Sequence, residues 1–437
     1  MTPTARALWA AALAALAALG ATGCDGLFGV DFDDARRAGA GAGGQGGSGA
    51  TGAGGAGGWA GPGHGWTRLQ LLDGTDGLPH AATDLVRSIW CESLDRCLAV
   101  TEGADFDVAG NVYAATHQAV VALLFEGYGI DESVAFLGVA PAAGGVVARI
   151  NRTEPLVRAA GDFMSASAWS ASDAGDLWNQ DGLHIAQMLF QAGESGSCLA
   201  VDGSVLVANQ LPGAEAVWVP AWSPPGIPNN FWSLSYSDDL LCKSGPNVAR
   251  GATGYISDDL RYLAFPAGNS LDDDNAGACV SSDAGELFRY APLPEGEVAS
   301  GGPKGLRCND TAHCWLIGED GSNGAAYVYY STGVIGGERG NELGWLRASV
   351  VEGGQRVLED IAFAPDNLHG FVVGTEAPGR GLLIASDDGG KTWSENLVAG
   401  LAAFQGVELL SVFALDADDI WVGGSDGLLM SNGRGGR

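Results

Sequence analysis

The chain has 437 residues, with 52 acidic residues against 22 Lys and Arg, 70 Gly and a formal net charge of −30. This excess of negative charge argues against nucleic acid as a partner, and against an anionic membrane surface bound through the protein itself. It excludes little more, because an acidic exterior is common among secreted domains.

The N-terminus has the pattern of an export signal. Arg6 is followed by an uncharged run of mainly Ala and Leu over residues 7–21, which is shorter than the roughly twenty residues that span a bilayer. The small residues ATG at 21–23 stand directly before Cys24. This arrangement resembles the lipobox of bacterial lipoproteins, although that family usually has Leu in place of the first of these small residues. The resemblance implies a signal peptide that is cleaved before Cys24 and a lipid on Cys24; secretion with an unmodified cysteine is the alternative.

A tract of low complexity follows the proposed anchor. Residues 38–65 are nearly all Gly and Ala, a composition that forms no core and predicts a flexible tether with a reach of about 30 Å. We therefore expect a signal peptide (1–23), a lipid-anchored linker (24–65) and one folded domain (66–437). The protein is expected to be exported and held on a bacterial membrane, facing the periplasm or the cell surface, and these residues do not determine which leaflet holds the anchor.

Two pairs of cysteines in the folded domain share one spacing. Cys91 and Cys97 are six positions apart, as are Cys308 and Cys314. In an exported protein this spacing predicts disulfides that cross a tight hairpin, where facing Cα atoms lie close together. Zinc is disfavoured, because CxxC spacing and ligand histidines are missing. Three further cysteines leave their pairing open: Cys198, Cys242 and Cys279.

Short apolar runs that lead into Gly recur along the folded domain, as strands do before turns. They are RCLAVTEG at 96–103, SCLAVDG at 197–203, HCWLIGEDG at 313–321, HGFVVGTE at 369–376 and DIWVGGSDG at 419–427. A second unit has an aromatic residue eight positions before a Gly, and it begins at Trp66, Trp218, Phe288 and Trp345. From Trp218 onward the spacing of about 50 to 70 residues is near the period of a propeller blade.

The two ends of the folded domain are complementary. The C-terminal run GLLMSNGRGGR, residues 427–437, lacks the Trp-containing strand that follows such a run elsewhere, whereas Trp66 opens a strand of that kind with no run before it. We therefore predict an all-β fold, a single β-propeller in which the N-terminal strand completes the C-terminal blade and leaves no open edges. Seven blades fit the spacing best; six or eight remain open, because the interval 134–232 is irregular.

The stretch SDDGGKTW carries a family resemblance. Its residues Ser386, Asp388, Gly390, Thr392 and Trp393 resemble the Asp box of the BNR-repeat propellers, which include sialidases, sortilin-type receptors and photosystem II assembly factors. Ser and Asp oxygens accept free backbone N–H groups, Gly permits a positive φ, and Trp packs between blades. The resemblance implies a structural turn after the third strand of a blade, with no chemistry of its own.

No catalytic constellation can be assigned from the residue pattern. The Arg-Ile-Pro signature of the sialidases is missing, and the six His residues lack metal-ligand spacing. The polar run 272–275 is a calcium candidate against the alternative of a solvated loop, and no other cofactor or metal is expected. Trp222 lies among prolines and asparagines, and it is a candidate for stacking on a glycan or anchoring a protein partner.

These features favour a monomeric, non-catalytic propeller that binds a protein or glycan partner in a scaffold, assembly or recognition role. The alternative is a glycan-cleaving propeller hydrolase that uses a pair of carboxylates, which the sequence does not single out. The fold by itself does not decide between the two.

Overall fold

The described part of the chain is built almost entirely of strands, and its one helical element is the 3-10 turn η1 (Ala166–Ala168). Among the described residues no helix is long and apolar enough to cross a membrane. The computed structural model describes residues 65–71, 85–102, 110–123, 136–142, 145–150, 156–160, 162–171, 197–201, 204–209, 217–220, 254–256, 262–268, 276–282, 289–294, 303–320, 325–336, 343–348, 356–376, 379–395, 398 and 404–432.

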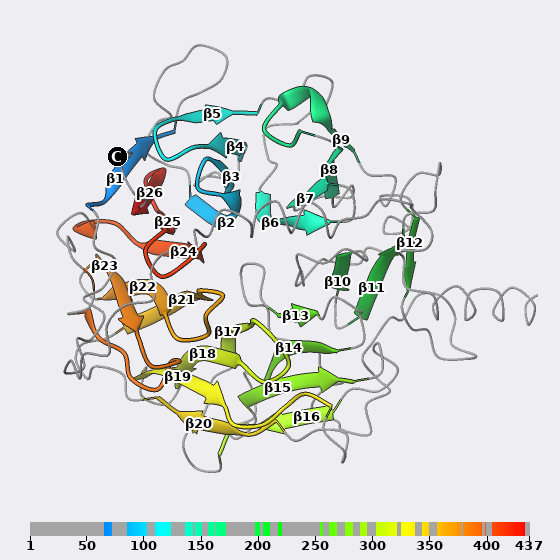
Figure 1. The fold of residues 1–437 in the computed structure, drawn as a ribbon, viewed down its shortest axis with the longest axis vertical. Coiled ribbons are helices and arrows are strands. Elements are labelled where there is room, and N and C mark those ends of the chain that lie inside the picture. Colours follow the sequence, from blue (N-terminus) through cyan, green and yellow to red (C-terminus); the bar gives the residue numbers. More distant parts are fainter. Residues whose placement is uncertain are drawn as a thin grey trace, which may run out of the picture.

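The strands form seven antiparallel sheets within these residues, and Figure 1 shows the sheets arranged around a common centre. Most are simple meanders in which consecutive strands pair. The first three sheets that the chain completes are β2–β5 (Leu85–Ser93, Arg96–Glu102, Val112–Ala115, Val120–Ala122), β6–β9 (Phe136–Ala142, Gly145–Ile150, Leu156–Ala160, Trp169–Ala171) and β10–β12 (Ser197–Val201, Ser204–Asn209, Val217–Pro220).

The remaining sheets continue the ring in chain order (Figure 1). Seven is also the predicted number of blades, and the blade number of the whole chain stays a prediction. The four sheets are β13–β16 (Tyr255–Ile256, Leu263–Gly268, Ala276–Ser281, Arg289–Pro292), β17–β20 (Pro303–Cys308, Cys314–Asp320, Ala325–Ser331, Trp345–Arg347), β21–β23 (Arg356–Phe363, Gly370–Glu376, Arg380–Ser386) and β24–β26 (Leu409–Ala414, Ile420–Gly424, Leu428–Asn432) together with β1 (Thr67–Gln70).

The first strand of the chain lies in the same sheet as the last. β1 pairs with β26 in an antiparallel ladder that runs from Thr67 opposite Ser431 to Gln70 opposite Leu428. The adjacent Trp66 packs edge to face on Phe404, with ring centroids 5.2 Å apart. The N-terminal strand therefore covers the edge of β26 that would otherwise be open.

The hydrophobic core lies between neighbouring sheets. Phe371, Val412 and Met430 belong to one buried cluster shared by β21–β23 and β24–β26, and Tyr113 and Trp421 belong to another shared by β2–β5 and β24–β26. Burial of each such side chain contributes about 1.5–3 kcal/mol. Because both faces of a sheet are covered, β25 and β26 are buried at every position, which explains why each begins with three apolar residues in a row without alternation.

Candidate functional site

The inner strands of five sheets share one irregularity. In each, a residue near the start of the strand nearest the ring centre (Figure 1) falls outside the ladder with the second strand, which is a β-bulge; β2 has a second such residue, Glu92, near its other end. A bulge bends its strand and re-aims the extra side chain. The bulged residues are Arg87 in β2, Leu137 in β6, Lys304 in β17, Glu359 in β21 and Leu410 in β24. Equivalent positions of three sheets thus carry charged side chains.

In three of the five strands, the residue that follows the bulge joins one sheet to the next through its side chain. The Ser411 hydroxyl donates to the carbonyl oxygen of Val86 at 3.0 Å, and the Val412 N–H donates to Asp360 Oδ2 at 3.0 Å. Ser88 Oγ accepts a backbone N–H from β6 at 3.4 Å. These hydrogen bonds run around the ring and hold the bulged segments of neighbouring inner strands in place.

The bulged charges of the inner strands form ion pairs. Arg87 Nε lies 2.5 Å from Glu102 Oε2, and Lys304 Nζ lies 2.7 Å from Glu319 Oε1 and 3.9 Å from Glu359 Oε1. Lys304 therefore links β17 and β18 to the neighbouring β21. We call the following group the inner-rim cluster: Arg87, Glu102, Lys304, Glu319, Glu359 and Glu408.

The charge of Glu359 is only partly compensated. Burial raises the pKa of Glu359 above its ordinary value, and the negative charges of Glu319 and Glu408 raise it further. Lys304 and Arg87 act in the opposite direction without cancelling the effect. Arg87 belongs to β2 and Glu359 to β21, so side chains from separate sheets converge closely enough to affect one another's ionisation.

Asp360 follows Glu359 and serves a structural role. Its side chain is 14 % exposed, and burial raises its pKa although Arg307 and two backbone donors oppose this. The donors are the N–H groups of Ile361 and Val412, and the nearest guanidinium nitrogen of Arg307 lies 3.7 Å from Asp360 Oδ1. The carboxylate thus connects three neighbouring inner strands.

A second group of charges lies on the β21–β23 sheet. Arg356, which is 7 % exposed, pairs with Glu376 at 3.1 Å and with Glu395 at 2.8 Å, and Arg380 pairs with the same two acids. Burial raises the pKa of Glu376, but hydrogen bonds from Arg380 and Arg356 outweigh it and hold the pKa below its ordinary value. Two cations and two acids balance here, so this group has no excess charge.

The Asp-box residues build their turn through hydrogen bonds among themselves. Ser386 Oγ accepts the Gly390 N–H at 2.9 Å and donates to Asp388 Oδ1 at 2.9 Å. Asp388 also accepts the N–H groups of Lys391 and Thr392 and the Thr392 hydroxyl, at 2.7–3.0 Å. Burial opposes the ionisation of Asp388, but these donors outweigh it and hold its pKa below the ordinary value.

The same turn packs against the preceding sheet. Trp393 Nε1 donates to the Gly390 carbonyl at 3.0 Å, and Trp315 Nε1 of β18 donates to the Gly389 carbonyl at 2.9 Å. Phe363 stacks on Trp315 with ring centroids 3.4 Å apart and meets Trp393 edge to face at 5.7 Å. The turn therefore joins two sheets, and its side chains are committed to that contact.

Both predicted disulfides are confirmed. Cys91–Cys97 connects β2 to β3 and Cys308–Cys314 connects β17 to β18, and in each the Cα atoms lie 4.0 Å apart. Cys279 is disulfide-bonded as well. The two bridges occupy equivalent ends of the inner hairpins of two sheets.

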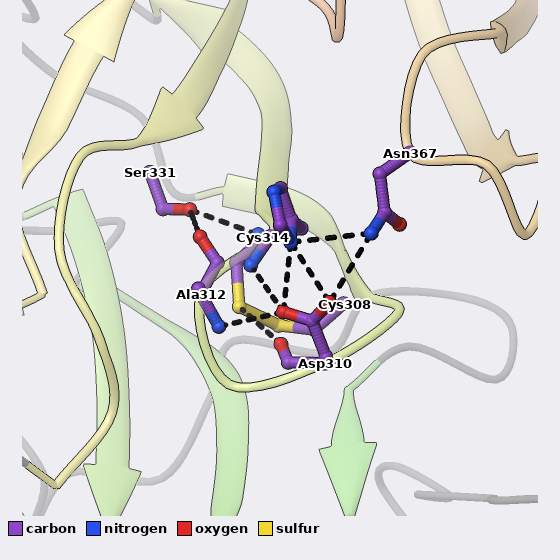
Figure 2. Close-up of a disulfide and its surroundings, with 7 residues drawn as sticks. Cys308, Asp310, Ala312, Cys314, Ser331 and Asn367 are labelled. Carbon is purple, nitrogen blue, oxygen red and sulfur yellow. Dashed lines mark hydrogen bonds and ion pairs between the residues drawn. A yellow bond between two sulfur atoms is a disulfide. The ribbon is translucent and has the colours of Figure 1, made fainter.

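Figure 2 shows the turn that the second bridge closes. Asp310 accepts the N–H groups of Ala312 and His313 at 2.8 and 2.9 Å, and Asn367 of the adjacent sheet donates to Asp310 at 3.2 Å. Ser331 donates to the Ala312 carbonyl at 2.6 Å. Burial raises the pKa of Asp310, but hydrogen bonds from the His313 side chain and the two backbone donors hold it below the ordinary value.

Several predicted positions lie outside the described residues. These are the lipidation site Cys24, the ligand-binding candidate Trp222 and the calcium candidate 272–275. In the portion that the structure describes, no group of three His, Cys, Asp or Glu residues could hold a metal ion.

The inner-rim cluster was missed by the sequence analysis. Its bulged members stand among apolar residues: Arg87 is the one charge of LVRSIWC at 85–91, and Glu359 is one of three in RVLEDIAF at 356–363. One signal could have found them: the residue after each charge is small or polar, namely Ser88, Gly305 and Asp360.

The C-terminal part of the chain matches a known family. Residues 344–437, which contain β20 to β26, match the family model described as photosynthesis system II assembly factor YCF48. No curated protein sequence matches the chain.

Solved structures resemble a larger share of the chain. YCF48 from Cyanidioschyzon merolae is 13% identical with a TM-score of 0.51, and the match covers 84% of this chain and 98% of that one. The fold is a β-propeller. YCF48 bound to a D1 peptide is 12% identical (TM-score 0.46, 84% and 96% covered). The propeller domain of Cps50 (Swd1) from Myceliophteria thermophila is 10% identical (TM-score 0.47, 82% and 98% covered).

Proposed function

We propose that this chain is a lipid-anchored β-propeller of the bacterial envelope that binds a protein partner and performs no catalysis. The observation that carries the proposal is the match of residues 344–437 to a family of assembly factors. This segment contains the Asp-box turn and the strands β21 and β24, which are two of the five bulged inner strands. Assembly factors act by binding other proteins, so a protein is favoured over a glycan as the partner.

The placement of charge on the ring supports the same proposal. Side chains from separate sheets meet in the inner-rim cluster, where they remain partly accessible: Lys304 is 33% exposed and Glu359 is 26% exposed. A charged surface built by several rigid strands is suited to partner recognition, because electrostatic complementarity selects and orients partners.

Anchoring is the second element of the proposal. The lipid on Cys24 and the Gly/Ala-rich tether would join the propeller at Trp66, beside the β1–β26 ladder. Cys24→Ser should release the protein from the membrane fraction and remove the mass of the lipid. A variant that stayed membrane-bound and differed in mass from the wild type only by the exchange of Cys for Ser would contradict the anchor.

Partner binding is tested on the full chain in its own envelope. Chemical cross-linking followed by affinity purification should recover one protein in stoichiometric amount, and the reciprocal purification should recover this chain. A panel of glycoside substrates tests the alternative of a glycan-cleaving hydrolase. Turnover by the purified protein that a single Asp or Glu substitution abolishes would overturn the non-catalytic proposal and favour a hydrolase.

A further inference from the structure

We infer that the inner-rim cluster binds a cationic group of the protein partner, the ammonium of a Lys or the guanidinium of an Arg side chain. This inference rests on the proposed function, since it names the chemistry that the partner presents. The cluster holds four carboxylates, on Glu102, Glu319, Glu359 and Glu408, against the two cations Arg87 and Lys304.

The two cations are already engaged by acids of their own sheets. Arg87 lies 2.5 Å from Glu102, and Lys304 lies 2.7 Å from Glu319. Glu359 reaches only the far side of Lys304, at 3.9 Å. Within the part of the chain that the structure describes, Glu408 forms no ion pair. The arrangement therefore leaves about two negative charges without a dedicated counter-charge.

The backbone keeps these groups from rearranging to neutralise one another. Arg87, Lys304 and Glu359 are the extra residues of β-bulges, and the hydrogen bonds of Asp360 and Ser411 to the next inner strand fix the bulged segments. A bulge is a defined device for aiming a side chain. The bulged positions themselves carry two cations and one acid, and the excess of acid comes from Glu102, Glu319 and Glu408 beside them.

The ionisation of Glu359 agrees with this geometry. Burial raises its pKa, the acids of β18 and of the segment before β24 raise it further, and the cations of β17 and β2 lower it too little to compensate. A third cation placed near Glu359 would favour its charged form and would be attracted in return. A side-chain cation fits better than a metal ion, because no described group of three ligating side chains is close enough to hold a metal.

The binding test uses a labelled octapeptide of alternating Gly and Lys, with a Gly and Glu octapeptide as the reversed-charge probe, in fluorescence anisotropy titrations of the full chain. The whole protein is acidic, so a Lys peptide will also adsorb without specificity. Glu359→Gln is therefore compared with Glu92→Gln. The control removes the same charge from the end of β2 that lies away from Arg87 and the inner-rim cluster, where Glu92 pairs with Arg96.

Glu359→Gln should weaken binding of the Lys peptide at least fivefold, whereas Glu92→Gln should weaken it less than twofold. Lys304→Met should strengthen it severalfold, because it removes the competing cation. This second variant keeps the test decisive if Glu359→Gln unfolds. Equal weakening by the two Gln variants, or weaker binding by Lys304→Met, would overturn the inference. Cross-linking of a protein partner would be unaffected by that outcome, so failure here is distinguishable from failure of the proposed function.

Discussion

Replacing Gly390 by Ala probes the contact between the Asp-box turn and the preceding sheet. Gly390 has φ +87°, and a Cβ there would lie 2.6 Å from Trp315 Nε1 and 2.7 Å from its Cδ1. Gly379, at the β22–β23 turn, is a matched control, because it has φ +71° but a Cβ would meet nothing within 4 Å.

The two variants differ in only one contribution to the free energy of unfolding. Both place Ala at positive φ, which costs about 1–2 kcal/mol. Gly390→Ala must in addition displace Trp315, which donates to the Gly389 carbonyl and stacks on Phe363. Overpacking of this kind costs about 1–3 kcal/mol more. We therefore expect a loss of about 1 kcal/mol for Gly379→Ala and about 3 kcal/mol for Gly390→Ala.

The assay is urea unfolding of the full chain with its disulfides intact, followed by tryptophan fluorescence. A parallel thermal scan should place the melting temperature of Gly390→Ala about 4 °C below that of the control, at roughly 2 °C per kcal/mol for a domain of this size. Equal losses in the two variants would refute the close packing of Trp315 on the turn.

Three further predictions concern stability. Replacing Cys308 and Cys314 together by Ala should lower the free energy of unfolding by about 2 kcal/mol, as loop-closure entropy gives for a separation of 6 residues, and the difference should vanish in reductant. The loss of unfolding free energy caused by Asp388→Asn should become smaller as the pH falls. Because folding lowers the pKa of Asp388, the ionised carboxylate stabilises the fold fully at pH values above its unfolded-state pKa of about 3.9. This stabilisation is lost as the pH falls through the lower pKa of the folded state. A cost that stayed constant in urea titrations from about pH 6 to about pH 2.5 would contradict this. Asp360→Ala should cost about 2 kcal/mol, because two backbone donors lose their acceptor, whereas Asp360→Asn keeps an acceptor for one of the two and should cost about half as much in the same assay. Equal losses would show that the hydrogen bonds are not what stabilises this position.

Local sequence patterns were sufficient to predict an interaction when its partners lie close together in the sequence. They were also sufficient where a repeat lacks a strand that another segment resembles. The spacing of Cys308 and Cys314 matches a hairpin because neighbouring strands fix the distance between facing residues. The pairing of β1 with β26 followed from a C-terminal run without its Trp strand and a strand at Trp66 without its run. The Asp box was recognisable because the hydrogen bonds of its Ser, Asp, Thr and Trp side chains lie within residues 386–393.

For the inner-rim cluster the sequence offers only the small or polar residue that follows each bulged charge, which does not show that these charges meet. Whether Arg87, Lys304 or Glu359 is a bulged residue depends on the register between two strands, and a single extra residue in one strand leaves no mark on composition. Their proximity depends on the ring as well, since residues far apart in the chain meet only when each inner strand is brought to the same centre (Figure 1).

The sequence by itself therefore determined the strand-rich repeats, the two hairpin disulfides, the box turn and the pairing of the first strand with the last. The turn and the disulfides depend on contacts between residues close in the sequence. The pairing of β1 with β26 was indicated by the Trp-containing strand that the C-terminal run lacks and that the segment at Trp66 resembles. Tertiary structure alone decided which charges face one another, that Glu359 shares a cation with Glu319, and that Trp315 packs on the box of the next sheet. Those contacts cross between sheets, where their geometry is set by ladder register and by the arrangement of the sheets around a common centre rather than by any local pattern.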